Sequence, residues 1–239
     1  ALKVHGTTNA AAGSPVSITV GGTTYTTQVL YSANGNFIDF NIPAGDVQTL
    51  AATQGAKTIT VNLTNEYGTS QLLSPSLSVD TLAPATPALA PTGYADDVGS
   101  VQNANSTAAS TDDNTPGINV GAGLTTNTPS LYVNGVKVEA VYNSATGALT
   151  PVTALSDGTK AFTYTLTDAA GNESAQSPAL TVKINTAAPS IGSAIASWGA
   201  VLNAAESAQD QTINVTTAGI EDGQTVTVSL GGRTYTAAV

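Results

Sequence analysis

The residues with the clearest capacity for chemistry are acidic pairs in turn-like segments. Asp96 and Asp97 lie in GYADDVGSVQ, and Asp112 and Asp113 lie in TDDNTPGINV, so four carboxylates fall within eighteen residues. Charged residues make up only 9% of the chain, so this cluster is unusual for its composition. Ca²⁺ prefers carboxylate, amide and carbonyl oxygens, and grouped carboxylates repel one another without a counter-charge. The spacing therefore predicts a calcium site.

A second group of oxygen ligands follows in the segment LTDAAGNES, with Asp168, Asn172 and Glu173. The segment Asn203–Glu206 is a weaker candidate of the same kind. Asp and Asn also favour turns without any metal, because they hydrogen-bond to their own backbone, so turn formation is the alternative. The complete set of predicted calcium ligands is Asp80, Asp96, Asp97, Asp112, Asp113, Asp168 and Asn172.

Other chemistry has little support in the sequence. There is one histidine, His5, and no cysteine, so a nucleophile activated by a histidine base is not expected. Adjacent carboxylates in loops do not resemble the opposed pair of a glycosidase. Exposed Tyr132 and Tyr142 could stack on sugars, but the recurrence of Tyr25 at Tyr235 favours a packing role for that pair. The sequence predicts a protein that is not an enzyme.

The charge balance excludes two classes of partner. Sixteen acidic residues against six basic ones give a net charge of −10, which disfavours nucleic acid and anionic membrane surfaces. No apolar run approaches the roughly 18 residues of a membrane span. The absence of cysteine leaves core packing, metal binding or both to stabilise the fold.

Internal repeats divide the chain. DTLAP at 80–84 recurs as NTAAP at 185–189, which is 105 residues later, and the segment 14–29 recurs at 224–239, which is 210 residues later. Two matches that share one period predict modules at 1–80, 81–185 and 186–239. The first module is expected to lack its beginning and the third its last strands, so both should fray or take up strands from neighbours.

Within each module, apolar residues alternate with polar ones, as in Val16, Ile18 and Val20. Glycine-containing pairs, Gly21–Gly22 and Asn134–Gly135, then turn the chain, which is the signature of β-hairpins. The segment 46–54 could form a helix, but the surrounding Thr, Asn and Gly favour a short turn. Short strands with a period near 100 residues predict an all-β fold of tandem immunoglobulin-like β-sandwich modules that form an elongated rod.

This topology also predicts where the acidic groups lie. The first inter-strand loops of the middle module should bring Asp96, Asp97, Asp112 and Asp113 together near Asn185. The last loop should bring Asp168, Asn172 and Glu173 to the opposite end, near Asp80.

The linker DTLAP, the acidic segments quoted above and LTDAAGNESAQSP resemble the immunoglobulin-like repeats of giant bacterial adhesins. The segments NFIDFNIPAGDVQTL, LNAAES and EDGQTVTVSLGGRTYTAAV resemble a sister repeat that alternates with the first. The family comprises biofilm-associated, type I-secreted surface proteins of Gram-negative bacteria. The resemblance implies extracellular display and calcium near module junctions. This chain departs from the pattern where Asn185 replaces Asp80 of the first linker, and where Asn65 and Thr69 replace Asp168 and Asn172.

The expected function is a structural stalk that spaces an adhesive domain from the bacterial cell surface and is stiffened by calcium at module junctions. Its expected partners are the neighbouring modules of the same polypeptide, with the host or surface ligand bound elsewhere in the full protein. Two alternatives remain: a subunit of a surface lattice or filament, and an accessory glycan-binding module of a secreted enzyme.

Overall fold

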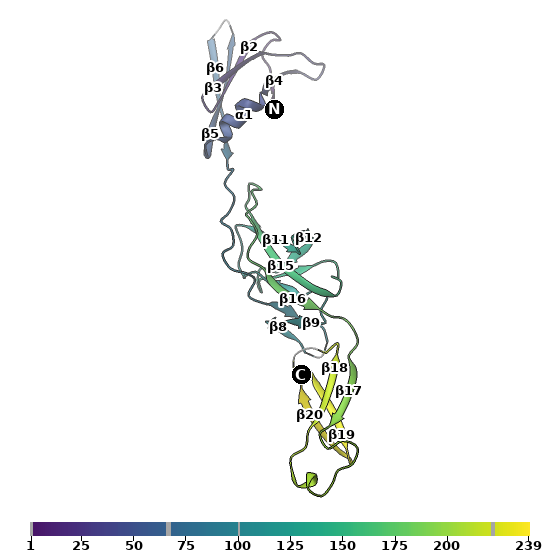
Figure 1. Ribbon diagram of the computed structural model, residues 1–239. Helices are drawn as coiled ribbons and strands as arrows, with labels where there is room; N and C mark the ends of the chain where they lie inside the picture. Colours follow the sequence, from purple (N-terminus) through teal and green to yellow (C-terminus); the bar gives the residue numbers. More distant parts are fainter. Residues whose placement is uncertain (1, 66–67, 100, 221–222) are drawn as a thin grey trace. The chain divides into compact units, whose positions relative to one another are not determined.

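The computed structural model describes residues 2–65, 68–99, 101–220 and 223–239 (Figure 1). The chain separates into two compact units, Ala1–Leu82 and Ala83–Val239, each of which is described by itself. Nearly all regular structure is β-strand, which confirms the all-β prediction. None of the described helices has both the length and the apolar character needed to cross a membrane.

The first unit is built from two sheets and one helix. A four-stranded antiparallel sheet has the order β3-β2-β5-β6, and a two-stranded antiparallel sheet pairs β1 with β4. The elements are β1 (Leu2–Thr8), β2 (Pro15–Val20), β3 (Thr23–Gln28), β4 (Asn36–Ile42), α1 (Ala44–Ala51), β5 (Gly55–Asn65) and β6 (Gly68–Val79).

Alternation along β2 forms the core of this unit. Val16, Ile18 and Val20 are buried, while the intervening residues are half-exposed. They pack in one cluster with Phe40 and Ile42 of β4, and with Val29 and Leu50. The period of two in the sequence therefore corresponds to one buried face, as predicted.

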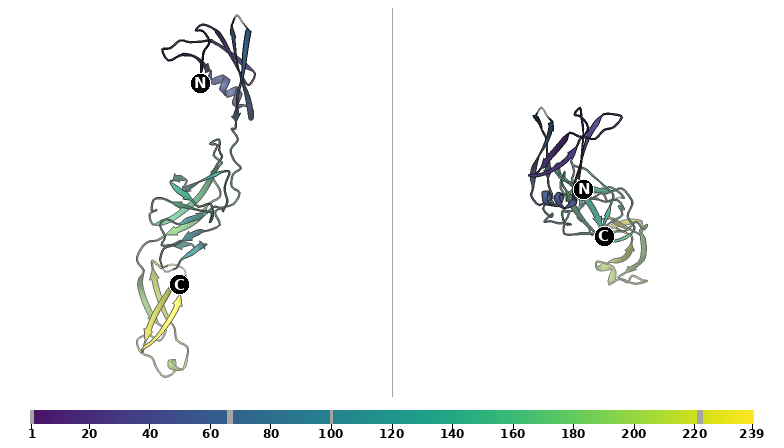
Figure 2. Two further views of the ribbon diagram at one scale, coloured as in Figure 1. Left: turned by 180° about the vertical axis from the view of Figure 1, so that it is seen from behind. Right: turned by 90° about the horizontal axis from the view of Figure 1, so that it is seen from above.

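The segment 46–54 was expected to be a turn, and this expectation was wrong. Residues Ala44–Ala51 form α1, which runs alongside the strands of the first unit (Figure 2). Pro43 precedes the helix with a φ of −58°, which is compatible with helical backbone. The carboxylate of Asp46 in the first turn interacts favourably with the positive end of the helix dipole. Leu50 is buried against the sheet, so packing stabilises a short helix that local propensity does not support alone.

Residues 94–184 form a complete β-sandwich of two five-stranded sheets, with the orders β13-β14-β10-β7-β8 and β12-β11-β15-β16-β9. The strands are β7 (Tyr94–Asp96), β8 (Asn103–Ser106), β9 (Ser110–Thr111), β10 (Gly117–Asn119), β11 (Thr128–Val133), β12 (Val136–Val138), β13 (Ala140–Tyr142), β14 (Ala148–Pro151), β15 (Gly158–Thr167) and β16 (Leu180–Ile184). The Asn134–Gly135 turn between β11 and β12 has φ values of +50° and +79°, which confirms the predicted hairpin.

The core of this sandwich receives side chains from both sheets. Tyr94, Ile118 and Leu149 come from the first sheet, and they meet the second sheet's buried residues. Phe162 and Leu131 are fully buried at the centre of the second sheet. The sandwich thus buries a contiguous core without the disulfide that pins many immunoglobulin domains.

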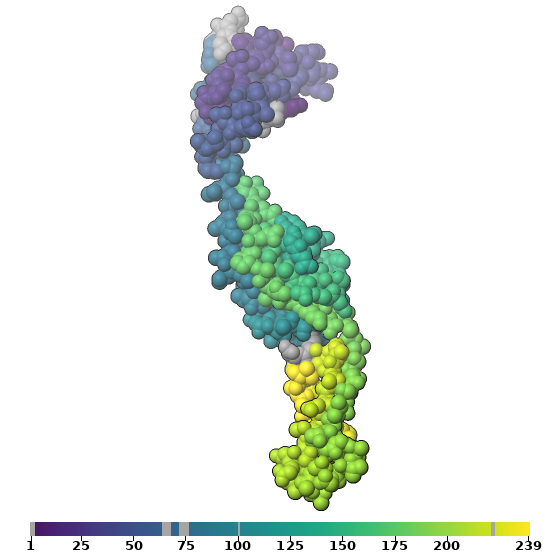
Figure 3. All heavy atoms as spheres, in the orientation of Figure 1, coloured from purple at the N-terminus to yellow at the C-terminus, as the bar shows by residue number. Residues whose placement is uncertain are grey.

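Residues 190–239 form two separate antiparallel strand pairs, β17 with β18 and β19 with β20. The elements are β17 (Ser190–Ala196), the 3₁₀ turn η1 (Glu206–Ala208), β18 (Ile213–Ala218), β19 (Thr225–Leu230) and β20 (Arg233–Ala238). Between their facing sides lies an open hollow of about 590 Å³, lined by Trp198, Val226 and Val228 among others. Figure 3 shows openings between the yellow β19–β20 hairpin and the yellow-green strands opposite it.

The internal repeat has a structural counterpart. Strands β2 and β3 begin and end 210 residues before β19 and β20, and their turns have similar φ values, +55° at Gly21 and +58° at Gly231. Equivalent sequence therefore folds into an equivalent hairpin twice. The module limits themselves stay a prediction, because only the break at Leu82 is marked by compactness.

Candidate functional site

The acidic loops close one end of the 94–184 sandwich. Asp96 is the last residue of β7, and Asp112 and Asp113 directly follow β9. The chain then crosses to the other sheet, where β10 pairs with β7 through Ile118 and Tyr94. Strand β9 runs parallel to the end of β16, and the amide of Asn185 donates to the carbonyl of Thr111 at 2.9 Å. The structure therefore gathers the predicted acidic group near Asn185.

Thr111 and Asp96 make the central polar contact of this end. Thr111 is fully buried and Asp96 is 6% exposed, and the Thr111 hydroxyl donates to Asp96 Oδ2 at 2.9 Å. The other carboxylate oxygen, Asp96 Oδ1, is buried and makes no hydrogen bond to the described residues. A buried carboxylate oxygen without a donor is costly, so it points to a cation or a proton that would satisfy it.

Asp113 lies deeper than its neighbour in sequence. It is 1% exposed, and its Oδ1 accepts hydrogen bonds from the Thr115 amide at 2.7 Å and the Thr115 hydroxyl at 3.2 Å. The amide of Asp97 also donates to the Asp113 carboxylate, which connects the two acidic loops. The side chain of Asp97 itself is exposed.

The electrostatics of the two buried carboxylates favour a positive counter-charge. Burial raises the pKa of Asp96 above its ordinary value of 3.8. Hydrogen bonds from the Thr111 hydroxyl and the Val98 backbone amide oppose this effect, and the nearby carboxylates of Asp113 and Asp112 add to it. Burial likewise raises the pKa of Asp113, although hydrogen bonds from Thr115 oppose this effect. Either a bound cation or protonation would relieve the repulsion.

Gly99 holds the loop against Asp112. Its φ is +75°, and a side-chain carbon built on it would come within 2.2 Å of Asp112 Oδ2. The loop thus needs glycine for its backbone conformation and for the close approach of the carboxylate. Gly99 and Thr111 were not identified from the sequence, and the only signal for either was its position beside an acidic pair.

The acidic side chains at this end of the sandwich do not by themselves form a complete coordination shell for a metal ion. Across the described ranges, no three or more His, Cys, Asp or Glu side chains converge as a group that could hold a metal ion. Further oxygens would have to come from the Thr111 hydroxyl, backbone carbonyls or water, which Ca²⁺ accepts readily.

At the other predicted site, Asp168 and Asn172 form a self-contained turn. Asp168 Oδ1 accepts from the amides of Ala170 and Asn172, each at 2.9 Å, and Oδ2 accepts from the Asn172 side-chain amide at 3.0 Å. The Asn172 side-chain hydrogen bond is the largest cause of the lowered pKa of Asp168. These contacts are those of the turn alternative. Asp80 belongs to the first unit, where its Oδ1 accepts from the Leu82 amide, and its proximity to Asp168 stays a prediction.

Glu173 takes part in a network that sequence reasoning missed. Its carboxylate accepts from Tyr132 at 2.9 Å and from Lys137 at 3.0 Å, and also from the Thr165 hydroxyl. The Thr165 and Lys137 hydrogen bonds lower the pKa of Glu173. Tyr132, which was considered as a sugar-stacking residue, thus uses its hydroxyl to bind an acid on the same sandwich.

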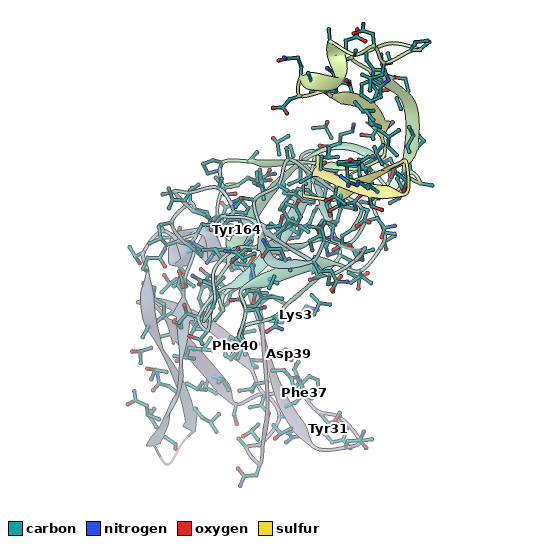
Figure 4. The ribbon with its side chains drawn as sticks, turned by 90° about the horizontal axis from the view of Figure 1, so that it is seen from below. Lys3, Tyr31, Phe37, Asp39, Phe40 and Tyr164 are labelled. Carbon is teal, nitrogen blue, oxygen red and sulfur yellow. The ribbon has the colours of Figure 1, made fainter. Side chains whose placement is uncertain are left out.

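The remaining candidates have local partners. His5 Nδ1 lies 2.6 Å from Asp39 Oδ1 across the β1–β4 pair, and both side chains are largely exposed. In Figure 4, Lys3, Phe37 and Asp39 lie along this strand pair. In the segment Asn203–Glu206, the Asn203 side chain accepts from the Glu206 amide and the Glu206 carboxylate accepts from the Asn203 amide, each at 2.9 Å. This reciprocal pair resembles a capping box.

The buried carboxylates predict an acid-stabilised sandwich when metal is withheld. Their raised pKa values mean that their protonated forms favour folding, so this contribution is complete below an ordinary Asp pKa of about 3.9 and is lost as pH rises through the raised values. In chelator, the native chain should therefore lose melting temperature relative to Asp96→Asn as the pH rises towards neutrality, because the variant has no carboxylate to ionise at this position. Glu139→Gln, which changes an exposed carboxylate, is the control. A native-minus-variant difference that does not change with pH would contradict this expectation.

No family model and no curated protein matches the sequence. Several solved structures resemble this chain, each with low sequence identity and a low TM-score. Fibronectin(III)-like modules of Clostridium thermocellum CbhA have 11% identity and a TM-score of 0.32, over 76% of this chain and 84% of theirs. The tetra-tandem repeat in the extending region of a large adhesion protein has 17% identity and a TM-score of 0.25, over 99% of this chain and 58% of its own.

The Bacteroides ovatus protein SGBP-B, solved with a mixed-linkage heptasaccharide, has 20% identity and a TM-score of 0.23. The likeness covers 76% of this chain and 42% of SGBP-B, so the chain spans less than two thirds of this structure and of the adhesion repeat. All three TM-scores are below 0.5, and the all-β fold of this chain is established by its own strands.

Proposed function

We propose that this chain is a spacer segment of a bacterial cell-surface adhesin, made of tandem sandwich modules and displayed outside the cell. The observation that carries the proposal is the repeated hairpin, in which β2–β3 and β19–β20 share bounds and turn geometry at a fixed 210-residue interval. Tandem repetition of one β-module is an economical way to build length. A strand such as β15, with 10 residues, spans about 33 Å at ~3.3 Å per residue, which sets the length that each module adds.

A calcium ion at the acidic end of the 94–184 sandwich is the second part of the proposal. Asp96, Asp112 and Asp113 would supply carboxylate oxygens, and Thr111 its hydroxyl. Two observations support a cation at these residues: the buried Asp96 Oδ1 accepts no hydrogen bond from the described residues, and the pKa values of Asp96 and Asp113 are raised. The ion would neutralise these charges and join the β7–β8 loop to the β9–β10 loop beside Asn185, where the module ends.

The composition supports a spacer more than a binding surface. Only 9% of residues are charged, and hydroxyl and amide side chains hydrate the exposed faces. Pro84 and Pro189 follow the two repeat boundaries and restrict the backbone there.

Mass measurements distinguish the spacer from a lattice subunit. The variant Val228→Asp makes the 190–239 hollow polar and so prevents association through its apolar lining. For this variant, we expect light scattering to give the monomer mass of 23.7 kDa at every concentration. Association that persists in this variant would indicate lateral contacts elsewhere and favour the lattice. A glycan array tests the accessory-module alternative, and saturable binding of one glycan class would overturn the spacer proposal.

A further inference from the structure

Two short segments of matching sequence lead into the long strands β5 and β15. TQGAK at 53–57 recurs as SDGTK at 156–160, which is 103 residues later. Each segment has a hydroxyl residue first, then glutamine or aspartate, then glycine, and a lysine last. Each module also ends on a linker with a threonine at its second position, Thr81 in DTLAP and Thr186 in NTAAP. The two segments and the two threonines therefore form equivalent pairs.

In both modules the glycine of the segment closes a strand pair at the same point. Gly55, the first residue of β5, lies opposite Val79, the last residue of β6. Gly158, the first residue of β15, lies opposite Ile184, the last residue of β16. Both glycines have left-handed backbone, with φ values of +93° and +110°. The residue before each glycine therefore lies where the linker leaves its module.

That residue binds both polar groups of the linker threonine with one side chain. Gln54 Oε1 accepts from the Thr81 amide at 3.0 Å, and Gln54 Nε2 donates to the Thr81 hydroxyl at 2.6 Å. Asp157 Oδ1 accepts from the Thr186 amide at 3.1 Å and from the Thr186 hydroxyl at 2.9 Å. The hydroxyl accepts in the first contact and donates in the second, so a carboxamide and a carboxylate make the same connection.

The lysine at the end of each segment supports the turn from which this side chain projects. Lys57 Nζ donates to the Thr53 hydroxyl at 2.6 Å. Lys160 Nζ donates to the Ser156 hydroxyl at 3.1 Å and to the Asp157 carbonyl at 3.3 Å. Because Lys160 is buried, with 9% of its surface exposed, its ammonium group needs such partners. The lysine thus fixes the residue next to the glutamine or aspartate in both modules.

We propose that TQGAK and SDGTK are latches, each a binding site for the threonine of the linker that follows its own module. A latch fixes the start of the linker to the preceding strand pair, so that the linker can bend only after the threonine. Ordinary turn formation is the competing interpretation, but turn residues bind their own neighbouring backbone, whereas these side chains reach 27 and 29 residues along the chain. The mechanical use of the latch rests on the proposed spacer function, and the latch contact itself does not.

Amide hydrogen exchange of the full chain, resolved by residue with NMR, tests the second latch. We expect Asp157→Ala to speed exchange of the Thr186 amide by about fivefold or more, because this amide loses its acceptor. Asp157→Asn is the matched control and should retain most of the protection, since it keeps an acceptor oxygen. After correction for intrinsic rates, Thr186→Ser should be protected like the native residue, whereas Thr186→Val, which lacks the hydroxyl, should be less protected.

The first latch gives an independent repetition of the test. Gln54→Ala should speed exchange of the Thr81 amide by a similar factor, and Gln54→Glu should retain most of the protection. The amides of Phe162 and Tyr164 in β15 report whether the sandwich stays folded, and they should exchange equally in every Asp157 variant.

Equal exchange of the Thr186 amide in the native chain and in Asp157→Ala would overturn the latch. Equal loss of protection in Asp157→Ala and Asp157→Asn would also overturn it, because the contact made by Gln54 needs no charge. Either result in a chain that is monomeric by light scattering would leave the spacer proposal intact. Association of the chain together with a protected Thr186 amide would instead overturn the spacer and leave the latch.

Discussion

Truncation of Phe162 to alanine is expected to lower the free energy of unfolding of the 94–184 sandwich by about 3–5 kcal/mol. Phe162 is fully buried on β15, where it pairs with Val133 on one side and Leu180 on the other. Removing the ring leaves a cavity between the two sheets that surrounding strands cannot close. A loss of this size is a large fraction of the roughly 5–15 kcal/mol that stabilises a typical domain.

Chemical denaturation of the full chain, followed by hydrogen exchange in residues 94–184, measures this loss. Val136→Ala on β12 is the control, because Val136 is 66% exposed and its truncation should change stability by less than about 0.5 kcal/mol. Equal effects of the two substitutions would contradict the assignment of Phe162 to the core.

Calcium is expected to stabilise the same sandwich by about 1.4 kcal/mol when its concentration exceeds the dissociation constant tenfold. For a domain of this size, that corresponds to several degrees of melting temperature, of the order of 5 °C. Sodium at equal ionic strength should not reproduce the shift, because screening weakens repulsion without supplying a coordinated ion. Replacing Asp112 and Asp113 with Asn should remove most of the shift. Asp168→Asn, at the other predicted site, should retain the shift, because hydrogen bonds within its own turn already satisfy the Asp168 carboxylate.

A pair of glycine variants separates loss of the site from backbone strain. Gly99 and Gly123 have the same φ of +75°, but only at Gly99 would a side-chain carbon collide with Asp112. Both alanine variants should lose stability through strain, and only Gly99→Ala should also lose the calcium shift. Retention of the full shift in Gly99→Ala would show that the Asp112 carboxylate does not contribute to binding.

The strands were predictable because their signal is local. Alternation in β2 and the Asn134–Gly135 turn each specify a conformation within a few residues, and both predictions are confirmed. Helix α1 was not predictable in the same way, because its stability depends on burial of Leu50 against a sheet. Local propensity was therefore a poor guide where tertiary packing decided the conformation.

The acidic site was predictable only in part. A sandwich topology implies that the loops after β7 and β9 meet at one end, so the proximity of the two acidic pairs followed from the fold. Which carboxylate in each pair is buried did not follow, because it depends on where each strand ends. Asp96 ends β7 with its side chain inward, and Asp97 is exposed. The hydrogen-bond partners of Glu173 were missed for a similar reason, since Tyr132 and Lys137 lie on strands distant in sequence.

The central claim, a cation-stabilised module end, is tested most directly by hydrogen exchange of the full chain in calcium and in chelator. We expect calcium to slow exchange at the amides of Asp97, Asp113 and Thr115, and at Asn185, which donates to Thr111. The amides of β2 and β3 in the first unit serve as the internal reference and should exchange equally in both conditions. Identical exchange around Asp113 with and without calcium would contradict the claim, and the acidic pairs would then be turn-forming residues with buried carboxylates.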